Sequence, residues 1–118
     1  MSFYTATCHK LAAHGYLVIA LNHQDESCFF TIDKDGKDIP HVLKDNDLPY
    51  RKTQMATRTE EVLSVIETLK TLTPELHFEI FGGFAPNAKI DMSELILAGH
   101  SYGSATMIAT DSKIAESV

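Results

Sequence analysis

The chain has 118 residues, and its 16 acidic side chains against 10 basic ones give a formal charge of −6. That length suits a single domain, and a hydrophobic content of 44% is enough to form a core, which excludes a disordered chain. The acidic balance argues against nucleic acid as a partner, because phosphate binding needs a basic face.

A helix followed by a buried strand is predicted at the start of the chain. Residues 3–14 place apolar side chains at three- to four-residue spacing, and Gly15 is a natural helix end. Residues 16–21, with the sequence YLVIAL, are apolar on both faces, which is typical of a strand inside a parallel sheet. Helix, glycine turn and buried strand make up half of an α/β repeat.

A long polar segment separates this strand from the clearest helix. Residues 22–50 show little periodicity, apart from a candidate short strand at 29–32. Residues 52–72 carry an apolar stripe at helical spacing, and Thr73-Pro74 ends the pattern because the residue before a proline avoids helical geometry. We interpret the stripe as core rather than as a partner-binding face. It consists of Met55, Thr59, Val62, Ile66 and Leu69.

The last part of the chain repeats the strand-and-helix pattern. Residues 74–93 form a connection, and residues 94–98, ELILA, form a short apolar strand. A helix then runs from Ser101 to about Thr110. Together these elements predict an α/β fold in which a parallel sheet is flanked by helices. The predicted inward-facing residues of the last helix are Ala105, Ile108 and Ala109.

The sequence contains no signal for membrane insertion or secretion. Its longest apolar run, residues 16–21, is far shorter than the roughly 18 residues that would suggest a membrane span. Met1 is followed by polar and small residues rather than by a secretory signal. We therefore expect no transmembrane segment, and a cytoplasmic location is favoured over a secreted one.

The cysteine and histidine patterns do not indicate a metal site. Cys8 and Cys28 form no C-x-x-C motif and are expected to be reduced, mostly buried thiols. None of the six histidines belongs to an H-E-x-x-H motif, and His9 and His14 are five residues apart, which does not stack them on one helix face. We expect neither a metal nor another cofactor.

A G-x-S-x-G motif, Gly-His-Ser-Tyr-Gly at residues 99–103, lies between a predicted strand and a predicted helix. In this context the chain reverses sharply and holds the serine, here Ser101, in a strained conformation with its hydroxyl beyond the end of the sheet. Gly99 and Gly103 are expected to remove Cβ atoms that would collide as strand and helix close together. The amide of Tyr102, at a helix N-terminus, would then be one oxyanion donor.

The motif lacks an obvious base. A serine hydroxyl is a poor nucleophile at neutral pH unless a base activates it. α/β-Hydrolases place an acid and then a histidine after the serine, yet no histidine follows Ser101. His100 is expected to point away from the hydroxyl and to pack under the turn. An upstream pair, such as His23 with Asp25, would require a chain order foreign to these hydrolases.

Two blocks of the sequence carry a resemblance to a known enzyme family. Residues 11–20 and 22–27 resemble a helix ending in His-Gly, a buried strand and a His-Arg-Asp-x-Ser segment. Residues 99–106, Gly-His-Ser-Tyr-Gly-Ser-Ala-Thr, resemble the sequence Gly-His-Ser-Phe-Gly-Gly-Ala-Thr. Both patterns are those of the platelet-activating factor acetylhydrolase family, plasma and intracellular type II. Gln24 and Ser104 depart from it, because the family tends to have arginine and glycine there.

The resemblance implies a serine esterase with an α/β-hydrolase fold, in which Ser101 is the nucleophile and the Tyr102 amide an oxyanion donor. Such an enzyme cleaves a short sn-2 acyl group, such as acetyl, from a phospholipid through an acyl-enzyme, and contacts the membrane surface transiently. The resemblance also implies that residues 1–118 are the central part of one hydrolase domain. N-terminal strands with a His-Gly-x-Gly loop would precede them, and the catalytic acid and histidine would follow. We expect this part alone to be inactive.

Two other hypotheses remain open. A related esterase of the dienelactone hydrolase or cutinase-like kind, acting on non-phospholipid esters, would share the helix–glycine–strand unit and the G-H-S-x-G motif. Residues 23–27 and the loop after them favour the phospholipid branch. The third hypothesis is a non-catalytic remnant that binds a partner or a lipid, because the chain does not contain a complete triad in hydrolase order.

Overall fold

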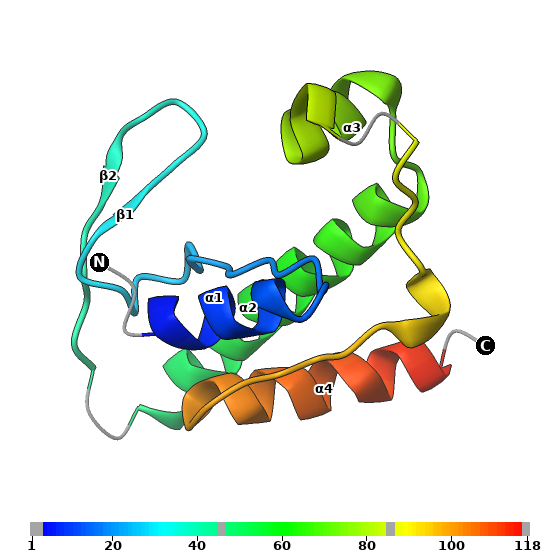
Figure 1. The fold of residues 1–118 in the computed structure, drawn as a ribbon. Helices are drawn as coiled ribbons and strands as arrows, with labels where there is room; N and C mark the ends of the chain where they lie inside the picture. Colours follow the sequence, from blue (N-terminus) through cyan, green and yellow to red (C-terminus); the bar gives the residue numbers. More distant parts are fainter. Residues whose placement is uncertain (1–3, 45–46, 85–86, 117–118) are drawn as a thin grey trace.

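The fold is mainly helical in the computed structural model, which describes residues 4–44, 47–84 and 87–116. Figure 1 shows one long helix running alongside another, with a short helix at the opposite end of the molecule from a small hairpin. The elements in chain order are α1 (Thr5–Ala13), β1 (Thr31–Ile32), β2 (Asp38–Ile39), α2 (Leu48–Lys70), α3 (Pro74–Phe81), η1 (Gly82–Phe84), η2 (Met92–Glu94) and α4 (Tyr102–Glu116).

Helix α1 confirms the first predicted helix from Thr5 onward; the predicted residue 3 lies outside the described residues. The helix ends where expected, because Gly15 adopts a φ of 91°, a left-handed conformation that glycine tolerates without strain. The amide of Gly15 donates to the carbonyl of Ala12 at 3.0 Å, which satisfies one of the last carbonyls of the helix.

Helix α2 confirms the predicted helix at 52–72 and begins four residues earlier. Its N-cap is Asp47, whose carboxylate accepts a hydrogen bond from the amide of Tyr50 at 3.0 Å. Pro49 lies in the first turn, where its missing N–H costs nothing. Capping by a carboxylate and a first-turn proline therefore explain why the helix starts before its apolar stripe does.

The core lies between α2 and α4. Val62 and Ile66 of the predicted stripe are buried, each 5% exposed, and so is Thr59. The α4 residues that face them are Thr106 and Thr110, which are fully buried. The hydroxyl of Thr110 donates to the carbonyl of Thr106 at 2.8 Å, so a polar atom is buried with its hydrogen bond intact. β-Branched side chains therefore line this helix contact.

The prediction for the inward face of α4 is wrong. Ile108 is 70% exposed and Ala105 is also exposed, while Ala109 is only half-buried. The face toward α2 is set by Thr106 and Thr110, which are one helical turn apart. The opposite face, which carries Ile108, has no element packed on it in the described residues.

Within the described residues the predicted parallel sheet is not formed. The sheet in the described residues consists of β1 and β2, which pair antiparallel with Thr31 opposite Ile39. The predicted strands at 16–21 and 94–98 run instead as irregular chain, apart from the 3-10 turn η2 (Figure 1). A strand of either kind needs hydrogen-bonding neighbours. Neither segment has a ladder partner within the described residues, and most of their large apolar side chains are exposed.

Helix α3 occupies part of the segment predicted to be a connection. Thr73 and Pro74 were expected only to end the preceding helix, but they also begin α3: Thr73 is the N-cap and Pro74 lies in the first turn. The hydroxyl of Thr73 accepts from the amide of Leu76 at 3.2 Å. The same proline thus stops one helix and is compatible with the start of the next.

The hairpin β1–β2 is the regular secondary structure that the long segment at 22–50 forms before α2 begins at Leu48. Thr31 and Ile32 confirm the second half of the candidate strand at 29–32. The turn between the strands contains Gly36, with a φ of 78°, and its amide donates to the carbonyl of Asp33 at 3.1 Å. In the part of the chain that the structure describes, no helix is both long and apolar enough to cross a bilayer.

Candidate active site around the nucleophile elbow

The G-x-S-x-G segment forms a sharp turn between the irregular chain at 95–98 and the start of α4 at Tyr102 (Figure 1). Ser101 has a φ of 55°, a left-handed conformation that is unusual for a residue with a side chain. The turn is closed by two hydrogen bonds of 2.9 Å, from the amide of Gly103 to His100 and from the amide of Ser104 to Ser101. Ser101 is exposed, as expected for a residue at the tip of such a turn.

The two glycines of the motif have different reasons to be glycine. A Cβ on residue 99 would lie 2.3 Å from the carbonyl oxygen of Gly103, so no side chain fits there. A Cβ on residue 103 would meet no described atom within 4 Å. The expected steric role is therefore present at Gly99, while the same prediction for Gly103 is wrong.

Ser104, one of the departures from the family pattern, has a local function. Its hydroxyl donates to the carbonyl of Gly99 at 2.8 Å, across the closest approach in the turn. This hydrogen bond links the residue that enters the turn to the first turn of α4. The side-chain hydroxyl of Ser104 therefore stabilises the turn through this hydrogen bond.

Tyr102 places its backbone amide at the first position of α4, a helix of 15 residues. The first amides of a helix have no partner inside it, and the helix dipole favours negative charge there. The side chain of Tyr102 is anchored at its far end, because its hydroxyl donates to the carbonyl of Arg51 at 2.8 Å. Burial raises the pKa of this phenol, although the nearby cations Arg58 and Arg51 act in the opposite direction.

His100 is exposed, which corrects the prediction that it packs under the turn. Its Nδ1 lies 2.8 Å from the hydroxyl of Tyr4, at the start of α1. The side chain therefore holds the turn against α1. Within the described residues, no histidine is hydrogen-bonded to the hydroxyl of Ser101.

The upstream pair of His23 with Asp25 is not formed. The Nδ1 of His23 lies 2.6 Å from a carboxylate oxygen of Glu61 on α2, and the other oxygen of Glu61 accepts from the amide of Gln24 at 2.9 Å. Asp25 is paired with Arg58 instead, with 2.5 Å between Nε and the carboxylate. Helix α2 therefore provides the partners of both loop residues: Glu61 binds His23, and Arg58 binds Asp25.

Asp25 is the most enclosed carboxylate of the region, with a fully buried side chain. Burial by itself would raise its pKa, but hydrogen bonds from Arg58 and Ser27 and the charge of Arg58 outweigh it and lower the pKa below 3.8. The hydroxyl of Ser27 donates to the same carboxylate at 2.6 Å. A shallow hollow of about 280 Å³ beside this loop is lined by His23, Ser27 and Arg58 among others, but not by Ser101.

The cysteines and histidines were also considered as possible metal ligands. Cys8 and Cys28 are free and half-buried, so the prediction that these thiols are mostly buried is wrong. Among the described residues, no group of three or more histidine, cysteine or acidic side chains is arranged to hold a metal ion.

Sequence reasoning missed two residues. Arg58 of α2 binds Asp25 in the 23–27 loop, and Tyr4 at the start of α1 binds His100 in the elbow. A signal for Arg58 exists in the sequence. Gln54 and Arg58 are one turn apart on α2, next to the apolar stripe, and polar side chains at such a position need buried partners. Both supply a hydrogen bond to Asp25.

A family model described as "Platelet-activating factor acetylhydrolase, isoform II" matches residues 1–116. The chain belongs to this family. Proteins named platelet-activating factor acetylhydrolase in Cavia porcellus and Bos taurus are each 29% identical to it, over 128 and 127 residues. Both alignments cover 92% of the chain but 28% of the relative, so the chain spans little more than a quarter of their length. No solved structure matches it. The family implies an α/β-hydrolase-like fold, of which the described residues hold the elbow and its helix.

Proposed function

We propose that the protein is a serine esterase that hydrolyses a short sn-2 acyl ester, such as acetyl, of a phospholipid of the platelet-activating factor type. The observation that carries the proposal is the elbow itself. Ser101 has a positive φ and is an exposed residue, and the next amide opens a 15-residue helix. Membership of the acetylhydrolase family and the names of the relatives support the substrate class.

In the proposed reaction the Ser101 Oγ attacks the sn-2 carbonyl carbon and gives its proton to a base. The carbonyl oxygen becomes an oxyanion that accepts from the Tyr102 amide. Collapse of this intermediate breaks the ester bond, releases the lysophospholipid alcohol after proton transfer, and leaves the acyl group on Ser101. Water then attacks the acyl-enzyme by the same route and releases the carboxylic acid.

The base and its acid partner are proposed to come from residues outside this chain, because His23 and Asp25 are engaged elsewhere. On this proposal residues 1–118 are the central part of one hydrolase domain, which agrees with the share of the relatives that they cover. The 118-residue chain alone would then lack esterase activity.

Replacing Ser101 in the full-length protein is the direct test. Ser101→Ala should abolish both ester hydrolysis and labelling by a fluorophosphonate probe. The matched control is Ser112→Ala, which removes an exposed hydroxyl from the same helix and should change neither readout. Turnover retained by Ser101→Ala would refute the nucleophile.

Substrate preference separates the phospholipid proposal from the related-esterase alternative. A short-acyl phosphatidylcholine should be hydrolysed with the higher kcat/KM, whereas a preference for simple aryl esters favours a dienelactone hydrolase or cutinase-like enzyme. A full-length protein that neither turns over esters nor labels at Ser101 would be the non-catalytic remnant.

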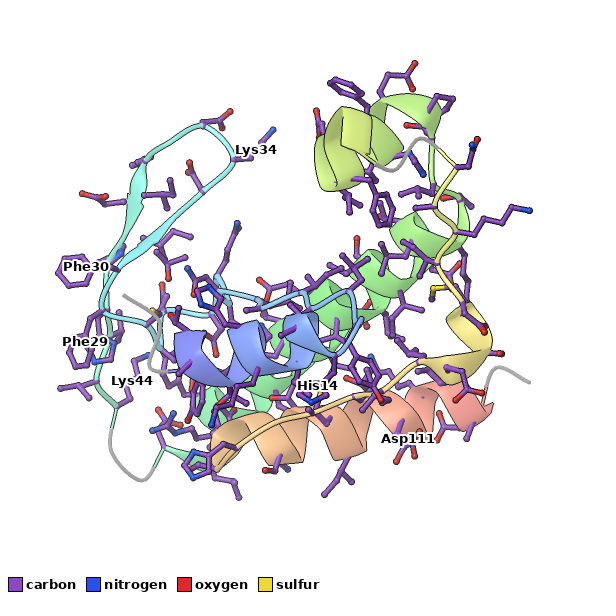
Figure 2. The ribbon with its side chains drawn as sticks, viewed as in Figure 1. His14, Phe29, Phe30, Lys34, Lys44 and Asp111 are labelled. Carbon is purple, nitrogen blue, oxygen red and sulfur yellow. The ribbon has the colours of Figure 1, made fainter. Side chains whose placement is uncertain are left out.

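We also propose that the protein contacts the membrane surface through the region of the hairpin. Phe29 and Phe30 are 74% and 88% exposed, and Figure 2 shows both rings projecting outward from the same side of the loop. Exposed aromatic rings suit the boundary between headgroups and acyl chains. Phe30→Ser should weaken binding to phosphatidylcholine vesicles. The control Ile108→Ser removes another apolar side chain, 70% exposed on α4, and should leave binding unchanged.

A further inference from the structure

Arg58 lies between two strained turns. Of the residues that the structure describes, Glu26 and Ser101 are the non-glycine residues with positive φ, at 63° and 55°. The guanidinium of Arg58 binds the residues on both sides of Glu26, namely the carboxylate of Asp25 and the hydroxyl of Ser27. It also lies 4.4 Å from the centroid of the ring of Tyr102, the residue after Ser101.

The orientation of Arg58 is fixed by its partners. Its side chain is 11% exposed and that of Asp25 is fully buried. The amide nitrogen of the Gln54 side chain donates to the Asp25 carbonyl at 2.9 Å, so the backbone of the loop is also held by α2. A planar guanidinium whose edge is paired in this way presents its face to an aromatic ring in one direction.

The ring of Tyr102 is held at two places as a result. Its face packs against Arg58, with the guanidinium of Arg51 farther away at 5.4 Å from the ring centroid, and its hydroxyl is anchored on the carbonyl of Arg51. A side chain fixed at its face and at its tip restricts the rotation of its own backbone. The backbone in question carries the amide that the proposed mechanism uses, and an oxyanion donor is effective only when it is preorganised to within about 0.5 Å.

We propose that Arg58 is a positioning residue for the oxyanion donor: it fixes the ring of Tyr102 and thereby the amide that follows Ser101. This inference rests on the proposed function of the elbow. The 23–27 loop is part of the same device, because Asp25 and Ser27 hold the guanidinium in place.

The test uses the full-length protein and the variant Arg58→Lys, which keeps the charge but loses the planar fork. Active sites are counted by fluorophosphonate titration, so that kcat refers to folded, competent enzyme. We expect kcat per titrated site on a short-acyl phosphatidylcholine to fall about tenfold, with KM unchanged, because a lysine cannot pair with Asp25 and Ser27 and stack on the Tyr102 ring at the same time. The control is Lys113→Met. It breaks an exposed ion pair between Lys113 of α4 and Glu60 of α2, and it should leave kcat unchanged.

A second variant identifies the route of the effect. Tyr102→Leu removes the ring, and the double variant Arg58→Lys/Tyr102→Leu should be no slower than the slower single variant, because Arg58 acts through that ring. A kcat per titrated site that survives Arg58→Lys, or effects of the two substitutions that multiply, would overturn the inference.

Hydrogen exchange gives a readout that does not depend on activity. The amides of residues 101–104 should exchange faster in Arg58→Lys than in Lys113→Met, while those of α2 remain protected in both. Unchanged exchange at the elbow overturns the positioning role. Failure of wild-type Ser101 to label refutes the proposed function instead, so the two failures are distinguishable.

Discussion

The carbonyl oxygen of Gly103 lies 2.3 Å from the place that a Cβ on Gly99 would occupy. The atom that such a Cβ would meet belongs to the backbone, so no side-chain rotation can relieve the clash. It follows that Gly99 cannot be replaced without moving the start of α4, whereas Gly103 has space around its own Cβ position.

Alanine substitutions at the two glycines should therefore have opposite effects. Gly99→Ala is expected to destabilise the full-length protein by about 1–3 kcal/mol, as an overpacked site does. Gly103→Ala lies in the first turn of α4 and should be neutral or stabilising by up to about 1 kcal/mol, because alanine is the better helix former. Urea unfolding of both variants measures the difference; a Gly99→Ala protein as stable as Gly103→Ala would contradict the close approach.

Glycine at position 101 should relieve the backbone strain of the elbow. Ser101→Gly and Ser101→Ala both remove the hydroxyl, but only glycine adopts a φ of 55° without a Cβ penalty. The glycine variant should be the more stable of the two by about 1 kcal/mol. Thermal unfolding of the two inactive proteins tests this, and equal melting temperatures would argue against a strained Ser101.

Asp25 should make stability depend on pH in the acid range. Its folded pKa lies below the ordinary 3.8 because Arg58 and Ser27 outweigh the effect of burial. The stabilisation is therefore complete above that ordinary value and is lost as the pH falls through the lowered folded pKa. Asp25→Asn should be less stable than wild type at pH 6, with the difference shrinking toward pH 2. The exposed Asp111→Asn serves as control, and a pH-independent difference for Asp25→Asn would be the contrary result.

The α2–α4 contact should account for much of the stability of the described residues. Ile66 is 5% exposed and Ile108 is 70% exposed. We expect Ile66→Ala to cost about 2–5 kcal/mol in urea unfolding, and Ile108→Ala to cost within about 0.5 kcal/mol. Equal losses would indicate that another element covers Ile108 in the full-length protein.

Features that depend on short-range sequence were predictable. The stripe at 52–72 is long and regular, so the helix and its buried residues Thr59, Val62 and Ile66 follow from spacing alone. The elbow motif likewise carries its own geometry, and the positive φ of Ser101 agrees with it. Pro74 was misleading because a proline that ends one helix is equally suited to begin another.

Features that depend on distant partners were not predictable in the same way. The segments at 16–21 and 94–98 have strand composition, but a strand exists only with neighbours to bond to, and the described residues provide none. The pairing of Arg58 with Asp25 spans 33 residues, and that of Tyr4 with His100 spans 96. The spacing of Gln54 and Arg58 on α2 indicates that these side chains need buried partners, but it does not say which residues those partners are.

The unpaired segment at 16–21 has a practical consequence for work with the 118-residue chain. Tyr16, Leu17 and Ile19 are 50%, 42% and 43% exposed on a backbone without ladder partners. Such a surface adsorbs hydrophobic dyes and templates edge-to-edge association. Purified on its own, the chain should enhance dye fluorescence without any denaturant, and its solubility should fall as sulfate is added, because excluded salts strengthen apolar contact between molecules.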